Sequence, residues 1–356
     1  MIKYLGSKRV LVDRIVSLAS SVRPGGTVVD LFSGTARVGH ALKAAGYRVL
    51  ANDYAAYAHR LATCYVQADA DDWSAPAAAL IAELQRVKPA PGYVTRTFCT
   101  EARYFTQDNG ARIDAIRAEI GRRALPPELE AIALVSLMEA ADRVDSTTGV
   151  QMAYLKDWAP RAANPLTLRV PALRPRAASG KGAAHRMDAV EAAGTLSGDI
   201  AYLDPPYNQH SYLGNYHVWE TLVSGDAPQA YGVARKRVDT RTRTSVFNSR
   251  PRHAAAMKQV IDDIDAAVLI VSFSDEGFLD RDDLVQMLSV RGDVAVFEFD
   301  FRRYVGAQIG IYNPKGKKVG EVSHLRNTEF LFVAGPADAV AAVRRAHDAA
   351  GAPTPL

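Results

Sequence analysis

Four residues could do chemistry together: Asp204, Pro205, Pro206 and Tyr207, which follow the apolar run 200–203. Two consecutive prolines lack backbone N–H groups and have a fixed φ, so a β-strand must end there. The rigid backbone can aim the Asp204 carboxylate and the Pro205 carbonyl at one point. The sequence therefore predicts a site with two hydrogen-bond acceptors at the carboxyl end of a strand.

Two such acceptors suit an exocyclic amino group, which is a poor nucleophile because its lone pair is delocalised into the aromatic ring. Acceptors that hold both amino hydrogens favour a pyramidal nitrogen, whose lone pair can attack an electrophilic methyl group. Tyr207 supplies a ring face on which an extruded base can stack. The chemistry indicated is direct methyl transfer to the amino nitrogen of a flipped base, without a covalent enzyme intermediate.

A second candidate site is the turn that contains Asp30, Phe32, Ser33 and Gly34. An aspartate at the end of a first strand, followed by a glycine turn that opens a helix, is typical of ligand sites in α/β sheets. The glycine allows the backbone to approach a nucleotide-like ligand closely. The turn is not a dinucleotide fingerprint, because Ala36 stands where a second glycine would fall.

Asn52 and Asp53 directly follow a second predicted strand, over residues 47–51. Asp53 lies roughly 20 residues beyond the glycine turn, where a carboxylate commonly hydrogen-bonds ribose hydroxyls. The two turns together predict a site for a ligand that contains a nucleoside.

The elements that must position these residues follow an α/β order. A strand over 27–32, a helix over 35–45 and the strand over 47–51 form a βαβ unit, which implies parallel strands and a right-handed crossover. The other predicted elements are a first helix over 8–20, strands over 200–203, 267–273, 294–301 and 328–333, and helices over 75–87, 111–122, 128–143, 216–223 and 281–288.

The long gap between the predicted strands indicates an inserted unit. At 356 residues the chain is too long for one minimal domain. We interpret residues 65–182, which contain helical segments separated by turns, as a mainly helical lobe. The sheet domain is then discontinuous, with residues 1–64 and 183–340, and residues 341–356 form a C-terminal tail.

The formal net charge is +4, and the basic residues are unevenly distributed. We interpret residues 208–257 as a basic segment that contacts DNA through phosphate neutralisation, with 208–216 framing the base pocket. Asp145–Gly149 and Lys156 in the helical lobe are further candidates for contacts to bases or backbone. The cations of the basic segment are Arg235, Lys236, Arg237, Arg241, Arg243, Arg250 and Arg252.

The two cysteines, Cys64 and Cys99, have no CxxC spacing and no accompanying histidine cluster. The sequence therefore predicts neither a disulfide framework nor a metal site. The first residues lack the apolar run of a signal peptide, and no run reaches the roughly 18 apolar residues of a membrane span. We expect a cytoplasmic protein without membrane contact.

The motifs occur in the order found in Dam-like, alpha-group adenine-specific DNA methyltransferases, which the sequence resembles. The resemblance rests on residues 3–8 (KYLGSK), the DLFSGT turn, the Asn52-Asp53 pair, the DPPY tetrapeptide and residues 326–332 (RNTEFLF), and so covers most of the chain. Ser7 and Ala36 depart from it, because the family has glycine at both positions. The resemblance implies an α/β fold with a Rossmann-like class I methyltransferase sheet and an inserted, mainly helical target-recognition lobe.

The resemblance also implies S-adenosylmethionine as the cofactor. Its methionine part would be wrapped by Phe32, Ser33 and Gly34, its ribose held by Asp53, and its adenine approached by Asp188. Residues 204–207 would form the catalytic clamp. The full set expected to bind the cofactor is Tyr4, Lys8, Asp30, Phe32, Ser33, Gly34, Asn52, Asp53 and Asp188.

The predicted function is site-specific methylation of double-stranded DNA, with N6 of adenine as the target. Methylation of cytosine N4 would use the same clamp, although the tetrapeptide then often begins with serine, so Asp204 favours adenine. Methyltransferases acting on RNA or protein glutamine typically begin it with asparagine and do not need the insertion and basic segment. A non-catalytic DNA-binding protein would not need an intact tetrapeptide. We further expect a monomer or weak dimer, and consider a cognate restriction endonuclease as a partner.

Overall fold

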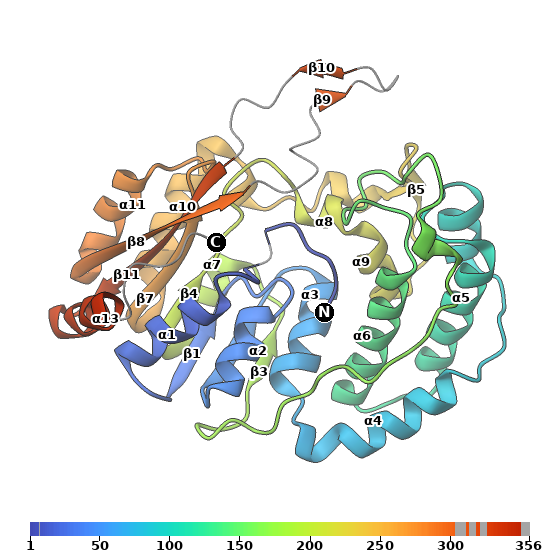
Figure 1. The fold of residues 1–356 in the computed structure, drawn as a ribbon, viewed down its shortest axis with the longest axis horizontal. Helices are drawn as coiled ribbons and strands as arrows, with labels where there is room; N and C mark the ends of the chain where they lie inside the picture. The colour runs from blue at the N-terminus through green and yellow to red at the C-terminus, as the bar shows by residue number, and fades with distance from the viewer. Residues whose placement is uncertain (7, 303–310, 313–317, 321–325, 350–356) are drawn as a thin grey trace.

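The computed structural model describes residues 1–6, 8–302, 311–312, 318–320 and 326–349, and its centre is a seven-stranded sheet (Figure 1). The strand order is β3-β2-β1-β4-β7-β11-β8. Strand β11 runs antiparallel to β7 and β8, and the other neighbouring pairs are parallel. The strands are β1 (Thr27–Asp30), β2 (Arg48–Asn52), β3 (Ala183–His185), β4 (Ser197–Leu203), β7 (Asp265–Ser274), β8 (Asp293–Arg302) and β11 (Arg326–Gly335). The predicted α/β fold with a Rossmann-like sheet is confirmed.

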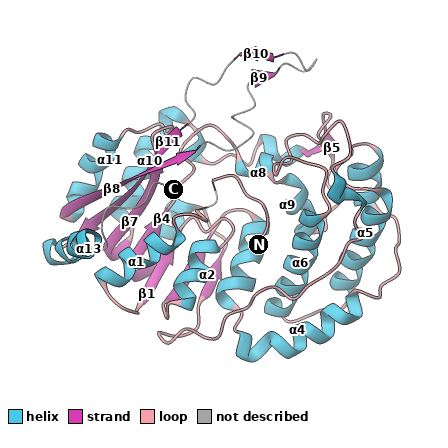
Figure 2. Cartoon of the chain, viewed as in Figure 1, coloured by secondary structure: helices cyan, strands magenta, loops and turns pink. Residues whose placement is uncertain are grey.

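Helices cover both faces of the sheet (Figure 2). Successive residues of β1, Val28 and Val29, are buried in two different hydrophobic clusters, because side chains alternate between the faces of a strand. One face packs against α1 (Val12–Val22), α2 (Arg37–Ala44), α3 (Ala56–Ala62) and α13 (Ala337–Ala349). The other packs against α7 (Ala189–Ala193), α10 (Arg250–Asp263) and α11 (Arg281–Leu288).

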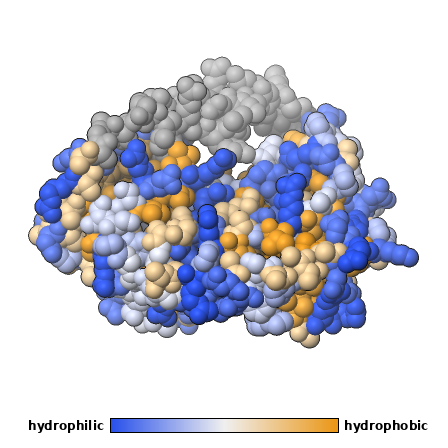
Figure 3. Space-filling view, turned by 60° about the horizontal axis from the view of Figure 1, so that its bottom comes forward, coloured by the Kyte–Doolittle hydropathy of each residue, from blue (hydrophilic) through white to orange (hydrophobic). Residues whose placement is uncertain are grey.

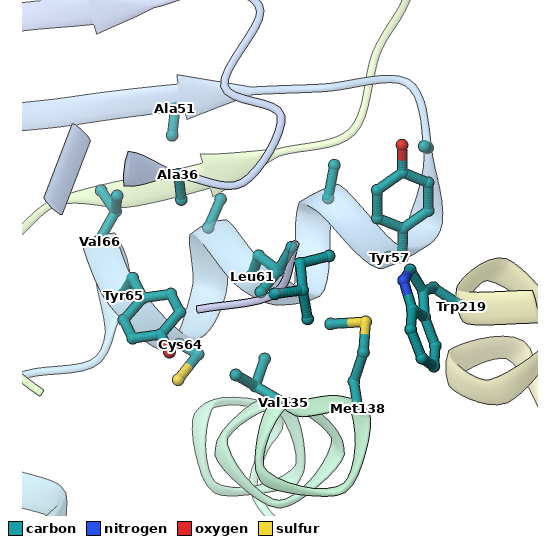
Figure 4. Packing of buried hydrophobic residues seen from close by; sticks show 14 of the residues in the cluster. Ala36, Ala51, Tyr57, Leu61, Cys64, Tyr65, Val66, Val135, Met138 and Trp219 are labelled. Carbon is teal, nitrogen blue, oxygen red and sulfur yellow. The ribbon is translucent and has the colours of Figure 1, made fainter. Parts of the chain in front are cut away.

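A helical lobe continues the sheet domain on the side of β2 and β3, to the right in Figure 1. It contains α4 (Ala70–Leu84), α5 (Gln107–Arg122) and α6 (Pro127–Arg143), and it also includes α9 (His217–Ser224) from the predicted basic segment. Helix α6 is its centre, and most of its residues are buried. Figure 4 shows Val135 and Met138 of α6 facing Leu61 and Trp219, so the lobe shares one core with the sheet domain.

Short elements complete the chain. The π-helical turn η1 (Thr63–Gln67) continues α3, η2 (Thr95–Thr100) precedes α5, and α8 (Tyr212–Asn215) precedes α9. Two small two-stranded sheets pair β5 (Ala230–Tyr231) with β6 (Lys236–Arg237), and β9 (Ile311–Tyr312) with β10 (Lys318–Gly320). Short 3-10 turns are η3 (Pro160–Ala163), η4 (Val238–Arg241), η5 (Val246–Asn248) and η6 (Ser289–Arg291).

Several predicted boundaries move. The first helix starts at Val12 and not at residue 8, so Lys8 lies in the preceding turn and is free to point away from the helix. The three-residue edge strand β3 was not predicted, because so short a run carries no periodicity. The predicted tail begins inside α13, and residues 350–356 and Ser7 lie outside the described part of the chain.

The two predicted sites meet because β1 and β4 are hydrogen-bonded neighbours. The amide of Leu31 donates to the carbonyl of Tyr202 at 3.1 Å, and Asp30 is in register with Tyr202. The strand order reverses between β1 and β4, and open α/β sheets bind ligands at the carboxyl ends of the strands at this point.

The described surface is mixed in character. Figure 3 shows mostly polar side chains over the outer ends of the molecule and smaller apolar patches nearer its middle. No helix in the described ranges combines the length and the apolar composition that crossing a membrane requires.

Candidate active site

A pocket lies at the carboxyl ends of β1, β2 and β4, where the glycine turn and the proline tetrapeptide come together. Its walls contain most of the residues predicted to bind a cofactor or the target base. Those on the walls are Tyr4, Lys8, Asp30, Phe32, Ser33, Gly34, Asn52, Asp53, Asp188, Asp204 and Pro206, joined by Ser211, Tyr212 and Leu213 from the segment expected to frame the base.

Asp53 holds the glycine turn in place. Its Oδ2 accepts a hydrogen bond from the Gly34 amide at 2.9 Å, and its Oδ1 accepts one from the Ala55 amide at 2.9 Å. Gly34 has φ +51°, and a Cβ there would lie 3.6 Å from the Tyr4 ring. Burial raises the pKa of Asp53 to about 6, although both amides oppose the shift. The carboxylate therefore fixes the turn and remains on the pocket wall.

Asn52, which was predicted to bind the cofactor, lies on the pocket wall, and its side chain is hydrogen-bonded to the backbone. Its amide nitrogen donates to the carbonyls of Leu31 and Met187, and its amide oxygen accepts from the Met187 amide at 3.0 Å. Its own carbonyl accepts from the Ser33 amide at 2.9 Å. Asn52 thus joins the ends of β1 and β2 to the loop before α7 and shapes the pocket indirectly.

Buried polar atoms without partners point to a ligand in this pocket. Within the described ranges, both carboxylate oxygens of Asp30 and the hydroxyl of Ser33 are buried without a hydrogen-bond partner. Burial raises the pKa of Asp30 to about 8, and the charges of Asp204 and Asp53 add to the shift. Buried polar groups are normally satisfied. These atoms therefore fit a polar ligand, and a nucleoside with hydroxyl and amino groups is of that kind.

Ala36 adopts a left-handed conformation with φ +58° at the start of α2. This backbone region favours glycine, because an L side chain is strained there. Ala36 therefore adopts at this turn a backbone conformation that glycine would adopt without strain.

Tyrosine side chains form one end of the pocket. The Tyr4 ring stacks on Tyr216 with a centroid distance of 4.4 Å and on Tyr212 at 5.2 Å. The Tyr4 and Tyr57 hydroxyls are 3.0 Å apart. Tyr57 was not predicted to line the site; it lies in the first turn of α3, which begins shortly after Asp53.

The Asp204 carboxylate is held by Lys8. The Lys8 ammonium lies 3.2 Å from Asp204 Oδ1 and 2.9 Å from Glu329 Oε2. Burial raises the pKa of Asp204 to about 6, with Lys8 opposing the shift and Glu329 adding to it. Burial alone would lower the pKa of Lys8, but Asp204 and Glu329 outweigh it and raise that pKa. Lys8, predicted to contact the cofactor, is thus engaged with the predicted catalytic carboxylate, and Glu329 is an additional residue.

The other three residues of the tetrapeptide lie next to Asp204 at this end of β4. Pro206 lines the pocket, and Pro205 is a buried residue. The half-buried Tyr207 ring lies 5.8 Å from the Phe273 ring, and its carbonyl accepts from the Phe278 amide at 2.9 Å. Asp188 lies at the pocket edge, where its side chain accepts from the Val190 amide and caps α7.

The prediction that Arg237 contacts DNA does not fit its position. Its guanidinium is buried and forms paired hydrogen bonds with Asp226 at 2.8 and 2.7 Å and with Asp239 at 3.0 Å. Arg243 also has a different place, because it lies on the pocket wall and binds Glu220 at 2.9 Å. Both cations are paired with acidic side chains from the same part of the chain, between residues 220 and 239.

The other predicted cations are more accessible. Arg241, Arg250 and Arg252 are exposed, and Arg235 and Lys236 are half-buried. The Arg241 guanidinium lies 3.9 Å from the centre of the Tyr231 ring, and Arg235 lies 3.3 Å from Glu101.

Most of the stretch predicted to read DNA from the helical lobe is interior. The Asp145 carboxylate pairs with Lys3 at 2.8 Å and Arg161 at 2.7 Å, and Ser146 and Thr147 are buried. These three residues are therefore structural, contrary to the prediction. Lys156 is exposed.

The chain is similar to known DNA methyltransferases along most of its length. The family described as D12 class N6 adenine-specific DNA methyltransferase matches residues 4–286. Type II methyltransferase M.NlaIII of Neisseria lactamica is 28% identical over 339 residues, which cover 92% of this chain and 99% of that protein. Type II methyltransferase M.CviAII of Paramecium bursaria Chlorella virus 1 is 29% identical, with 85% and 92% covered. Type II methyltransferase M.FokI of Planomicrobium okeanokoites is 29% identical over 93% of this chain, which spans only 52% of that protein.

Proposed function

The chain belongs to the D12 class of N6 adenine-specific DNA methyltransferases, and from this premise we propose that its pocket binds S-adenosylmethionine beside a flipped adenine held by Asp204. The observation that carries the proposal is the meeting of the two motifs at the β1–β4 switch point. Family membership also puts adenine N6 ahead of cytosine N4 as the target.

Three features of the pocket support S-adenosylmethionine as the methyl donor. The Asp53 carboxylate is placed for ribose hydroxyls, the Gly34 turn allows close approach of the backbone, and Asp30 and Ser33 offer unsatisfied polar atoms. Asp188 at the pocket edge suits a contact to the cofactor adenine. When bound, S-adenosylmethionine supplies an electrophilic methyl group on its sulfonium sulfur.

The Asp204 carboxylate and the Pro205 carbonyl would accept the two hydrogens of the adenine amino group. This withdraws the nitrogen lone pair from the ring and aims it at the methyl carbon. The nitrogen must lose one proton for each methyl group that it gains, and Asp204 is placed to receive it. Positioning and electrostatics then supply most of the acceleration.

For DNA, the exposed cations of the basic segment are the candidates for phosphate contacts. We keep Arg241, Arg250 and Arg252, with the half-buried Arg235 and Lys236 and the exposed Lys156, and withdraw Arg237 because it is buried and paired. Contacts of this kind weaken steeply with salt.

The relatives are named type II methyltransferases and modification methylases, and we propose that this chain likewise protects DNA from a cognate restriction endonuclease. Plasmid DNA from cells that express the chain should resist one member of a panel of type II endonucleases. If every enzyme in the panel digests this DNA although methyladenine is detectable, the chain does not methylate the recognition sites of these enzymes.

The direct test is methylation of unmethylated plasmid DNA with labelled S-adenosylmethionine, followed by mass spectrometry of the nucleosides. We expect N6-methyladenine with the parent chain and none with Asp204→Ala, which should still bind S-adenosylmethionine in calorimetry. Methylated cytosine N4, or near-normal turnover of Asp204→Ala, would refute the target base or the clamp respectively.

A further inference from the structure

Glu329 lies close to Asp204 and binds the same lysine, although its strand, β11, runs antiparallel to the neighbouring strand β7. Because β11 is antiparallel to β7, with Glu329 in register with Ser274, its beginning lies at the carboxyl edge where β4 ends. This places Glu329 beside Lys8 although the two residues are 321 positions apart in the sequence.

The Lys8 ammonium is shared between two carboxylates. It lies 2.9 Å from Glu329 Oε2 and 3.2 Å from Asp204 Oδ1, and its side chain is only 6% exposed. Asp204 Oδ2 has no hydrogen-bond or ion-pair partner among the described residues. The ammonium donates a hydrogen bond to Glu329 and forms an ion pair with Asp204.

We propose that Glu329 is a positioning residue for methyl transfer: it holds Lys8 at one oxygen of Asp204, so that the second oxygen of this carboxylate stays free for the amino group of the base. This inference rests on the proposed function of Asp204. Without Glu329, the ammonium would be free to bind both oxygens of Asp204 and so to compete with the amino group.

Removing Glu329 and removing Lys8 should shift the pKa of Asp204 in opposite directions. Removing Glu329 takes away a repelling charge and leaves Lys8 wholly to Asp204, so the pKa of Asp204 falls. Removing Lys8 leaves Asp204 beside Glu329 without a cation, so that pKa rises. The other titratable groups that face Asp204 are Asp30 of β1, Tyr202 of β4, Tyr207 and Tyr212 of α8, and all of them remain in both variants.

The test is the single-turnover rate of adenine methylation in plasmid DNA between pH 5 and 9, for Glu329→Gln and Lys8→Met. We expect Glu329→Gln to lower the plateau rate roughly 10- to 100-fold and to move the acidic limb about one pH unit downward, and Lys8→Met to move it upward. Glu298→Gln is the matched control, because Glu298 lies on the adjacent strand β8. Its side chain is 57% exposed and forms an ion pair with Arg281 at 3.2 Å. This control should keep the parent profile.

Two results would overturn the inference. One is a Glu329→Gln enzyme with the parent rate and pH profile. The other is a loss of rate with an unmoved acidic limb and a lower melting temperature, since that pattern belongs to damaged packing of β11. The parent enzyme tests the proposed function separately, because failure to methylate adenine at all would contradict that function whatever Glu329 does.

Discussion

Replacement of Asp53 by alanine should weaken cofactor binding far more than it weakens the fold. The carboxylate accepts one hydrogen bond from the Gly34 amide and one from the Ala55 amide, both at 2.9 Å, and it faces the pocket. The variant loses the proposed acceptor for the ribose hydroxyls. It also loses the bond that holds Gly34, so the turn that approaches the cofactor is less well ordered.

The magnitude follows from these bonds. A hydrogen bond to a charged group contributes about 1.5–3 kcal/mol. Only the ribose contact and part of the Gly34 contact bear on the bound state, because water can replace Asp53 at the Ala55 amide. A loss of about 2–4 kcal/mol corresponds to a Kd for S-adenosylmethionine that rises roughly 30- to 1,000-fold.

Isothermal titration calorimetry at pH 8 measures this directly, since the pKa of Asp53 is about 6 and the parent carboxylate is then ionised. Asp199→Ala is the matched control. Asp199 also accepts a backbone amide bond, from Thr27 at 2.7 Å, but at the opposite, amino end of β1. A Kd for Asp53→Ala within threefold of the parent value, or an equal loss in the control, would refute the assignment.

Other predictions concern protonation and packing. Methylation should fall as the pH drops through about 6, because Asp204 must be ionised to accept hydrogens and its pKa is about 6; single-turnover rates measure this. The protein should lose stability as the pH rises from about 4 through 8, because the pKa of Asp30 is raised to about 8 in the folded state. Asp30→Asn should therefore raise the melting temperature at pH 8 and not at pH 4. Arg237→Met should cost about 2–3 kcal/mol in denaturant unfolding without changing the salt dependence of DNA binding, whereas Arg252→Met should reduce that dependence. Met138→Ala should cost about 2–5 kcal/mol in the same unfolding assay, because the side chain is fully buried against α3 and α9.

Local backbone chemistry explains why much of the architecture could be predicted. The helix predicted over 281–288 is observed as α11, with a capping box between Asp280 and Asp283. The long strands β7 and β11 extend only a few residues beyond the predicted ranges. Apolar runs inside an element and glycine or proline at its end are local signals, so they predict the element whatever its tertiary contacts are.

Short elements and the tertiary positions of helices were harder to predict from the sequence. Helix α9 was predicted over nearly the correct residues, but its place in the helical lobe was not, because its contacts with α3 and α6 depend on segments more than 70 residues away. The three-residue strand β3 exists only because β2 offers it an edge, with Ala51 in register with Ala184.

The sequence by itself determined the kind of chemistry: a proline pair that ends a strand after Asp204, a glycine turn after Asp30, and an ordered set of motifs along the chain. These features are local, and each is dictated by which φ values and hydrogen bonds its own residues permit. The tertiary structure decided which charges remain available. Lys8 is shared between Asp204 and Glu329, which β4 and β11 bring to the same edge of the sheet. A charged side chain pairs with whatever the fold brings within a few ångströms, and that distance depends on the order and direction of the strands.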